Sequence, residues 1–266
     1  MTIPTPDLPG LLALMARLRD PASGCPWDRD QTFATIAPFT IEEAYEVAAA
    51  IEDQDWPHLK EELGDLLFQV VFHARMAEER GLFAFQDVVA TLVGKMVERH
   101  PHVFADVDRP DDAAAQTEAW EAIKSRERAA KAMSILDDVP RALPALTRAA
   151  KLQKRAGSVG FDWDSAPKVV EKLAEEAGEI VEARDQGAGP DRIEEEVGDL
   201  LFVVANLARH LKVDPEKALR SANAKFVRRF RYIEAGLKAA GRTPAEASLD
   251  EMEALWVEAK GKEKGQ

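Results

Sequence analysis

The chain has 266 residues, with 15 glycines, 15 prolines and one cysteine. This composition excludes collagen-like, low-complexity and disulfide-stapled proteins. An apolar content of 46% is enough for one or two domains with hydrophobic cores. The 35 basic and 48 acidic residues give a net charge of −13, which argues against binding a nucleic-acid backbone as the main role.

Neither end of the chain nor its apolar stretches predict a targeting or membrane segment. The start, MTIPTPDLPG, lacks the basic residues and apolar run of a signal peptide. The longest apolar stretch, 63–74, is interrupted by Gly64, Asp65 and His73 and is too short and polar to span a bilayer. Cys25, the single cysteine, suits a reducing compartment. We therefore expect a cytoplasmic protein with no membrane partner.

Apolar residues recur with helical spacing along almost the whole chain, and no alternating β-branched run predicts a strand. The predicted fold class is therefore all-α. Capping boxes at 40–43 and 248–251, and a proline after the N-cap residue at 214–215, mark three helix starts. The expected helices are 8–20, 40–53, 57–80, 86–99, 112–131, 140–156, 166–186, 191–211, 215–239 and 244–260.

An internal repeat divides the chain into two halves. The segments EEAYE and EELGDLLF of the first half return as EEAGE and EEVGDLLF in the second. They occupy 42–46 and 175–179, which are 133 positions apart, and 61–68 and 195–202, which are 134 positions apart. A proline-containing break at 134–144 lies between the copies. We therefore predict two tandem helical-bundle domains, 1–132 and 142–266.

Each half places four acidic residues at corresponding points of two consecutive helices. In the second half, Glu176 and Glu179 share one helix face, and Glu196 and Asp199 share another. The turn around Gly187 makes the two helices antiparallel, and at ~1.5 Å per residue the two pairs are level to within roughly 3 Å. The corresponding residues of the first half are Glu43, Glu46, Glu62 and Asp65.

Four converging carboxylates predict a metal site. Without a cation some of them must stay protonated, with raised pKa values. All-oxygen ligation favours Mg²⁺, or Mn²⁺, over zinc. Such an ion binds substrate phosphates and activates a water molecule.

Two other interpretations of the acidic residues compete with this one. A solvated acidic helix face explains one pair of acidic residues on one helix. It explains poorly why two such pairs lie at the same height in a hairpin, and why this arrangement occurs in both halves of the chain. A di-iron carboxylate bundle needs Glu-x-x-His on each of two helices, and none of the five histidines follows a glutamate at that spacing. The sequence also lacks a P-loop.

A basic and aromatic helix follows the second carboxylate set. Lys225 and Arg229 share one face, and Phe226 and Phe230 share a neighbouring face that can enter the core. The pattern fits an ordinary amphipathic helix, and it also fits a clamp for a polyphosphate chain. Three further candidates are Trp163, Trp256 and Lys260. The two tryptophans suit base stacking and core packing equally.

Together these motifs resemble the MazG family of nucleoside triphosphate pyrophosphohydrolases, in its tandem-domain form. The resemblance rests on E-E-x-x-E followed by E-E-x-G-D, on the K-F-x-x-R-F helix and on a terminal W-x-x-x-K. It covers nearly the whole chain in two copies. It implies an all-α fold, Mg²⁺ dependence and a homodimer in which partner helices complete each site. It also implies hydrolysis of NTPs and dNTPs, ATP included, to the nucleoside monophosphate and pyrophosphate.

The resemblance also implies roles for individual residues. The metal ligands and catalytic carboxylates would be Glu176, Glu179, Glu196 and Asp199, one of which also orients or deprotonates the attacking water. The substrate-binding residues would be Lys172, Glu175, Arg192, Glu195, Lys225, Arg228, Arg229 and Trp256, together with Lys260. The first half keeps its metal ligands Glu43, Glu46, Glu62 and Asp65, but it departs from the basic motif with Met96, Glu98 and His100.

We therefore expect both halves to bind Mg²⁺ and the second to turn over more nucleotide. A water molecule would attack the α-phosphorus in line while the metal and the basic helix neutralise the triphosphate. Two alternatives stay open. One is a narrower enzyme specific for dUTP, dCTP or an alarmone, and the other is a non-enzymatic helical interaction module.

Overall fold

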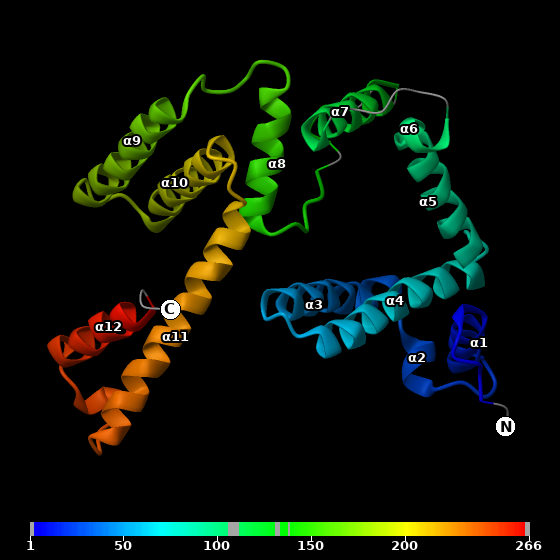
Figure 1. The fold of residues 1–266 in the computed structure, drawn as a ribbon. Helices are drawn as coiled ribbons and strands as arrows, with labels where there is room; N and C mark the ends of the chain where they lie inside the picture. The colour runs from blue at the N-terminus through cyan, green and yellow to red at the C-terminus, as the bar shows by residue number, and fades with distance from the viewer. Residues whose placement is uncertain (1–2, 106–111, 131–133, 138, 264–266) are drawn as a thin grey trace. The chain divides into compact units, whose positions relative to one another are not determined.

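The fold is all-α, as predicted, and no strand occurs in the described part of the chain (Figure 1). The computed structural model describes residues 3–105, 112–130, 134–137 and 139–263. The chain forms two compact units, Met1–Ile123 and Lys124–Gln266, and each contains one copy of the repeat. The predicted domain limits, 1–132 and 142–266, stay a prediction. No described helix has both the length and the hydropathy of a membrane span.

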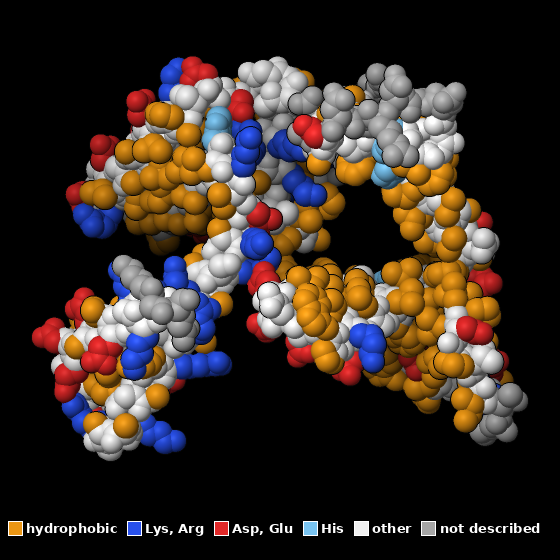
Figure 2. Space-filling view, in the orientation of Figure 1, with side chains coloured by type: hydrophobic (Ala, Val, Ile, Leu, Met, Phe, Trp, Pro, Cys, Tyr) orange, Lys and Arg blue, Asp and Glu red, His pale blue; other side chains and the backbone are white. Residues whose placement is uncertain are grey.

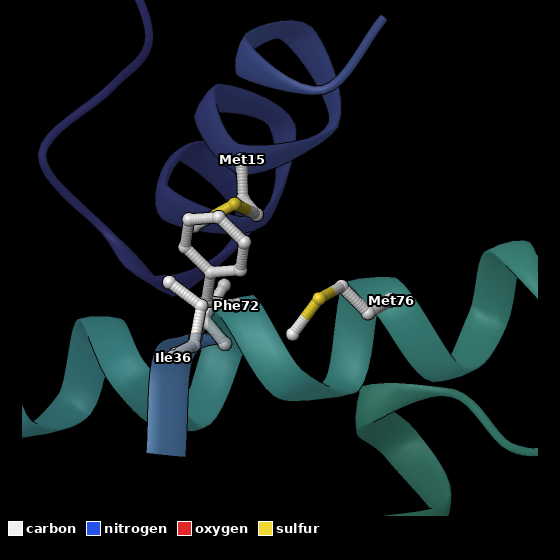
Figure 3. Close-up of a cluster of buried hydrophobic side chains, with 5 residues drawn as sticks. Met15, Ile36, Phe72 and Met76 are labelled. Atoms are coloured by element: carbon white, nitrogen blue, oxygen red, sulfur yellow. The ribbon is translucent and has the colours of Figure 1, made fainter. Parts of the chain in front are cut away.

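The first unit is built around the helical hairpin α3–α4. Its helices are α1 (Leu8–Leu18), α2 (Pro26–Asp30), α3 (Phe33–Glu52), α4 (Trp56–Glu79), α5 (Phe85–Arg99) and α6 (Pro101–Phe104), and α7 (Ala113–Ala130) follows. Helix α1 packs on α4 through Met15, which is fully buried with Ile36, Phe72 and Met76 (Figure 3). This cluster fixes α4 against α3 and so sets the width of the hairpin.

The second unit repeats the hairpin as α9–α10. Its helices are α8 (Ala145–Gly157), α9 (Ala166–Asp185), α10 (Pro190–His210), α11 (Pro215–Ala239) and α12 (Leu249–Glu263), with a 3-10 turn at Pro244–Glu246. Helices α9 and α10 lie side by side, α8 packs on α10, and α12 folds back on α11 (Figure 1). Val169, Val203, Ile233 and Leu237 are buried in these contacts.

The prediction that a helix starts at 40–43 is wrong, because α3 begins at Phe33. Thr32 and Thr35 form the capping box: the Thr32 amide donates to Thr35 Oγ1 at 2.8 Å and the Thr35 amide to Thr32 Oγ1 at 3.3 Å. Thr40 lies inside the helix and donates to the Ile36 carbonyl at 3.3 Å. Pro38 lies in the helix interior, where its ring nitrogen cannot donate a backbone hydrogen bond.

Smaller differences concern other helix ends. Helix α8 begins at Ala145 instead of 140, and α12 begins at Leu249 instead of 244. The predicted capping box at 248–251 is confirmed, since the Ser248 amide donates to Glu251 Oε2 at 2.8 Å. The short helices α2 and α6 were not expected, because a single turn carries too little periodicity to detect.

The turns of the two hairpins are built alike, so they hold the carboxylates at matching heights. Gln54 and Gly187, 133 positions apart, both adopt left-handed backbone angles, with φ of 56° and 70°. The next residue of each turn closes the same hydrogen bond: the amide of Asp55 donates to Ala50 and that of Ala188 to Ala183, both at 2.9 Å. Glycine suits this conformation, whereas Gln54 adopts it at an energetic cost.

Candidate metal centres and substrate-binding residues

The second hairpin brings carboxylates of α9 and α10 together. Oxygen atoms of Glu176, Glu196 and Asp199 all lie within 4.8 Å of one another. Glu176 is 5% exposed and Glu196 is 3% exposed, whereas Asp199 lies on the exposed rim. Glu179 is half-buried beside them, and its pKa is raised by burial and then by the charges of Glu176 and Glu196. The structure therefore brings three of the four predicted ligands together, and the electrostatic effect of Glu176 and Glu196 on Glu179 places the fourth near them.

Two cations neutralise the buried carboxylates of this hairpin. Lys172 Nζ lies 2.8 Å from Glu176 Oε1 and 2.7 Å from Glu175 Oε1. Arg192 pairs in the same way with Glu196 and, at 2.7 Å, with Glu195. Each cation therefore bridges an exposed carboxylate three residues further along the helix and a buried carboxylate four residues further along. Hydrogen bonds to Glu175 and Glu195 are the largest cause of the raised pKa values of Lys172 and Arg192.

The first hairpin gathers the same carboxylates with different neighbours. Oxygen atoms of Glu43, Glu62 and Asp65 lie within 4.8 Å of one another. Gln69 Nε2 donates to Glu43 Oε1 at 3.4 Å, and His58 Nδ1 lies 2.9 Å from Glu62 Oε1. Burial, followed by the neighbouring carboxylates, raises the pKa of Glu43 and of Glu62.

The two hairpins thus differ in the positive charge beside their carboxylates. Phe39 stands 133 positions before Lys172, and His58 stands 134 positions before Arg192. The first hairpin therefore lacks both permanent cations of the second. Sequence reasoning missed Phe39, His58 and Gln69, although the offsets of the repeat already pair the first two with the cations.

The donor set of each hairpin fits a hard divalent cation. It consists of carboxylate oxygens alone, two of them in the second hairpin belonging to almost fully buried side chains. Buried carboxylates need cations to stay ionised, and oxygen ligation suits Mg²⁺ or Mn²⁺. A small pocket of about 170 Å³ opens beside the second set and is lined by Glu179, Glu182, Ala183, Gln186, Ala188, Arg192 and Glu196.

The predicted basic and aromatic residues form one surface cluster on α11 and α12. The Arg229 guanidinium lies 5.2 Å from the Trp256 ring centroid, and Phe226 lies 5.5 Å from Trp256. Phe226 and Phe230 stack with their centroids 6.0 Å apart. The expectation that both phenylalanines enter the core is wrong for Phe226, which is 56% exposed because Trp256 covers only part of its ring.

The structure does not join this cluster to the carboxylates of its own unit. Within the described residues, Lys225, Arg228 and Arg229 form no ion pair with the carboxylates of α9 and α10. Trp163 is 37% exposed, and Lys260 is exposed on α12. Their substrate-binding roles, like those of the other assigned residues, stay predictions.

Comparison with known proteins identifies related chains. The MazG nucleotide pyrophosphohydrolase domain matches residues 31–104 and 165–233, which contain both carboxylate sets. A nucleoside triphosphate pyrophosphohydrolase of Escherichia coli is 52% identical over 255 residues, covering 95% of this chain and 97% of the relative. The nucleoside triphosphate pyrophosphohydrolase/pyrophosphatase MazG of Thermotoga maritima is 45% identical over 251 residues, covering 94% of each.

The carboxylates of the first hairpin make a prediction about stability without metal. The folded protein holds the Glu43 proton more tightly than the unfolded chain does, because its pKa is raised above 4.5. The contribution of the Glu43 carboxyl to the stability of the folded protein is therefore complete below pH 4.5, and it is lost as pH rises through the raised pKa. Glu43→Gln removes this loss and should raise the melting temperature in EDTA at pH 7 by on the order of 1–3 °C.

The same variant should change stability little at pH 4, where the wild-type carboxyl is already largely protonated. Calorimetric melting at the two pH values measures the difference. Glu42→Gln, which changes an exposed neighbouring carboxylate, is the matched control. A lower melting temperature of Glu43→Gln at pH 7 would contradict the repulsion described for this hairpin.

Proposed function

The chain belongs to the MazG family of nucleotide pyrophosphohydrolases, and from this membership we propose how its carboxylate hairpins hydrolyse nucleoside triphosphates. The chain is an enzyme of the nucleoside triphosphate pyrophosphohydrolase class, whose products are the nucleoside monophosphate and pyrophosphate. The observation that carries the proposal is the convergence of Glu176, Glu196 and Asp199 in one hairpin, repeated by Glu43, Glu62 and Asp65 in the other.

The second hairpin would hold the divalent cation through Glu176, Glu179, Glu196 and Asp199. When bound, Mg²⁺ offsets the charge of the carboxylates and of the phosphates and lowers the pKa of a bound water. Lys172 and Arg192 already pair with Glu176 and Glu196, so these two side chains are held in place before any ligand arrives. This pre-organisation keeps the reorganisation needed for ligand binding small.

Of these four carboxylates, Glu179 also suits the role of orienting the attacking water. It forms no ion pair within the described residues, and its raised pKa makes it a better proton acceptor than an ordinary glutamate. Water attacks the α-phosphorus, and the bond from that phosphorus to the α–β bridging oxygen breaks. The electron pair of this bond leaves with pyrophosphate, and the proton of the water passes to Glu179.

The arginines of α11 would bind the phosphates that leave. Arg228 is exposed, and Arg229 is held over the Trp256 ring, so a planar guanidinium is presented in a fixed orientation. Trp256 and Phe226 offer a stacking surface beside it for a base. These groups supply positive charge that the acidic hairpin lacks.

We further propose that the enzyme works as a homodimer. The accessible surface of the chain is 18463 Å². Two separate compact proteins, each with half of the 29.3 kDa mass of this chain, would together expose only roughly 14,000 Å². The excess surface is the amount expected of helical units that bury faces against another copy.

The exposed apolar residues lie on the metal-binding helices. Figure 2 shows hydrophobic side chains spread over the surfaces of the α3–α4 and α9–α10 hairpins. On α4 and α10 they recur at matching positions, 134 residues apart, and are 38–50% exposed: Leu63, Leu67 and Val70, then Val197, Leu201 and Val204. A second copy covering these faces would bring its own α11 towards the carboxylates, which α11 of the same unit does not pair with.

The first test of the proposal is product analysis in ¹⁸O-labelled water with a dNTP and Mg²⁺. Attack at the α-phosphorus places the label in the monophosphate and none in pyrophosphate. EDTA should abolish turnover and strongly weaken nucleotide binding, because without a cation the carboxylates repel an anionic nucleotide and only the basic residues of α11 and α12 still attract its phosphates. Label in pyrophosphate, or tight binding of ATP in EDTA, would contradict the mechanism.

The two hairpins should contribute unequally. Glu176→Gln removes a buried ligand of the hairpin that carries Lys172 and Arg192, and it should lower kcat at least ~100-fold. Glu43→Gln should lower kcat less than about tenfold, because the first unit lacks those cations and the aromatic basic motif. Steady-state assays of both variants at saturating Mg²⁺ measure the ratio, and a larger loss from Glu43→Gln would overturn the assignment.

A further inference from the structure

A pocket of about 240 Å³ lies between α11 and α12, and it joins the two arginines assigned to the substrate to residues that have no assigned role. Its lining residues are Arg228, Arg229, Tyr232, Ala259, Lys262 and Glu263. Three of these side chains are cationic, and one, Glu263, is anionic. The pocket therefore has the composition of an anion site with a carboxylate already in it.

Glu263 engages both arginines of the pocket. Its Oε2 accepts from Arg229 Nη2 at 2.6 Å and from Arg229 Nε at 2.9 Å, and its Oε1 lies 3.6 Å from Arg228 Nη2. The Arg229 side chain is only 15% exposed, so solvent screens this pair weakly. Two carboxylate oxygens set against two guanidinium groups present the charge and geometry that phosphate oxygens present.

Lys262 supplies the third cation, from the residue next to Glu263. Its Nζ donates to Tyr232 Oη at 2.7 Å and lies 4.6 Å from the Tyr232 ring centroid. The Tyr232 hydroxyl lies 3.2 Å from Glu258 Oε2, so the phenol links the lysine to α12. No carboxylate forms an ion pair with Lys262 in the described part of the chain, which leaves its charge available to an anion in the pocket.

We propose that Glu263 is a built-in competitor of the polyphosphate chain at Arg228 and Arg229, and that Lys262 is a further phosphate-binding residue. The proposal rests on the proposed function, since it assigns those arginines to the substrate. A polyphosphate displaces the carboxylate because it carries more charge and reaches all three cations. The cost of that displacement raises KM, and the return of Glu263 to the arginines favours release of pyrophosphate.

Binding of pyrophosphate by calorimetry, with the full chain in EDTA, tests this inference without the metal centres. Glu263→Gln should bind pyrophosphate about fivefold more tightly than wild type, equivalent to about 1 kcal/mol. Lys262→Gln should bind it more weakly. Glu253→Gln on the same helix, whose carboxylate forms no ion pair in the described residues, is the control for net charge and should stay within about twofold of wild type.

Opposite effects from neighbouring residues of α12 cannot come from a loosened helix, which would weaken binding in both variants. Unchanged or weaker binding by Glu263→Gln overturns the proposal, and so does equal tightening by Glu253→Gln. Wild-type turnover of a dNTP with Mg²⁺ is measured alongside. If the wild type hydrolyses the dNTP but Glu263→Gln does not bind pyrophosphate more tightly, this inference alone is contradicted. If Glu263→Gln binds pyrophosphate more tightly but the wild type does not hydrolyse the dNTP, the proposed function is contradicted and Glu263 remains a competitor of anions.

Discussion

The repulsion among carboxylates inside a helical hairpin is the constraint on which the rest of this structure depends. Burying an ionised carboxylate is costly unless a cation accompanies it. In the second hairpin Glu176 and Glu196 are almost fully buried, and Lys172 and Arg192 reach them from one turn away. The carboxylates are therefore held close together beside positive charge, and converging carboxylate oxygens are the ligands that a hard divalent cation requires.

The two halves differ in how they offset the repulsion among the carboxylates of their hairpins. Where the second hairpin has permanent cations, the first has Phe39 and His58, and the pKa values of Glu43 and Glu62 are raised instead. These two carboxyls hold a proton more tightly than ordinary glutamates, so protons compete more strongly with a metal for the ligands. This difference gives a physical reason for unequal contributions of two units that share one carboxylate pattern.

Much of the site could be predicted from the sequence because helical geometry is local and regular. Acidic pairs three residues apart, placed at equal distances from a short turn, must face one another across an antiparallel hairpin. The turn itself escaped prediction in the first half, because Gln54 gives no sign that it adopts the conformation of Gly187. The predicted start of α3 is wrong because Thr40 and Glu43 have the spacing of a capping box, whereas Thr32 and Thr35 cap the helix eight residues earlier.

What the sequence could not show is which opposite charges meet. Lys172 and Arg192 were assigned to the nucleotide by resemblance, and the structure places them first against the buried carboxylates. The pairing of Arg229 with Glu263 depends on how α12 folds back on α11, a contact between segments 34 residues apart that no local motif encodes. Helical periodicity predicts faces, and only tertiary packing decides what each face touches.

The most direct test of the central claim is anomalous diffraction from crystals grown with Mn²⁺ and a non-hydrolysable nucleotide. The account predicts an anomalous peak between Glu176, Glu196 and Asp199, with the nucleotide phosphates completing the coordination of the ion. It would be contradicted by a nucleotide bound with no peak there while Lys172 and Arg192 keep their pairs with Glu176 and Glu196.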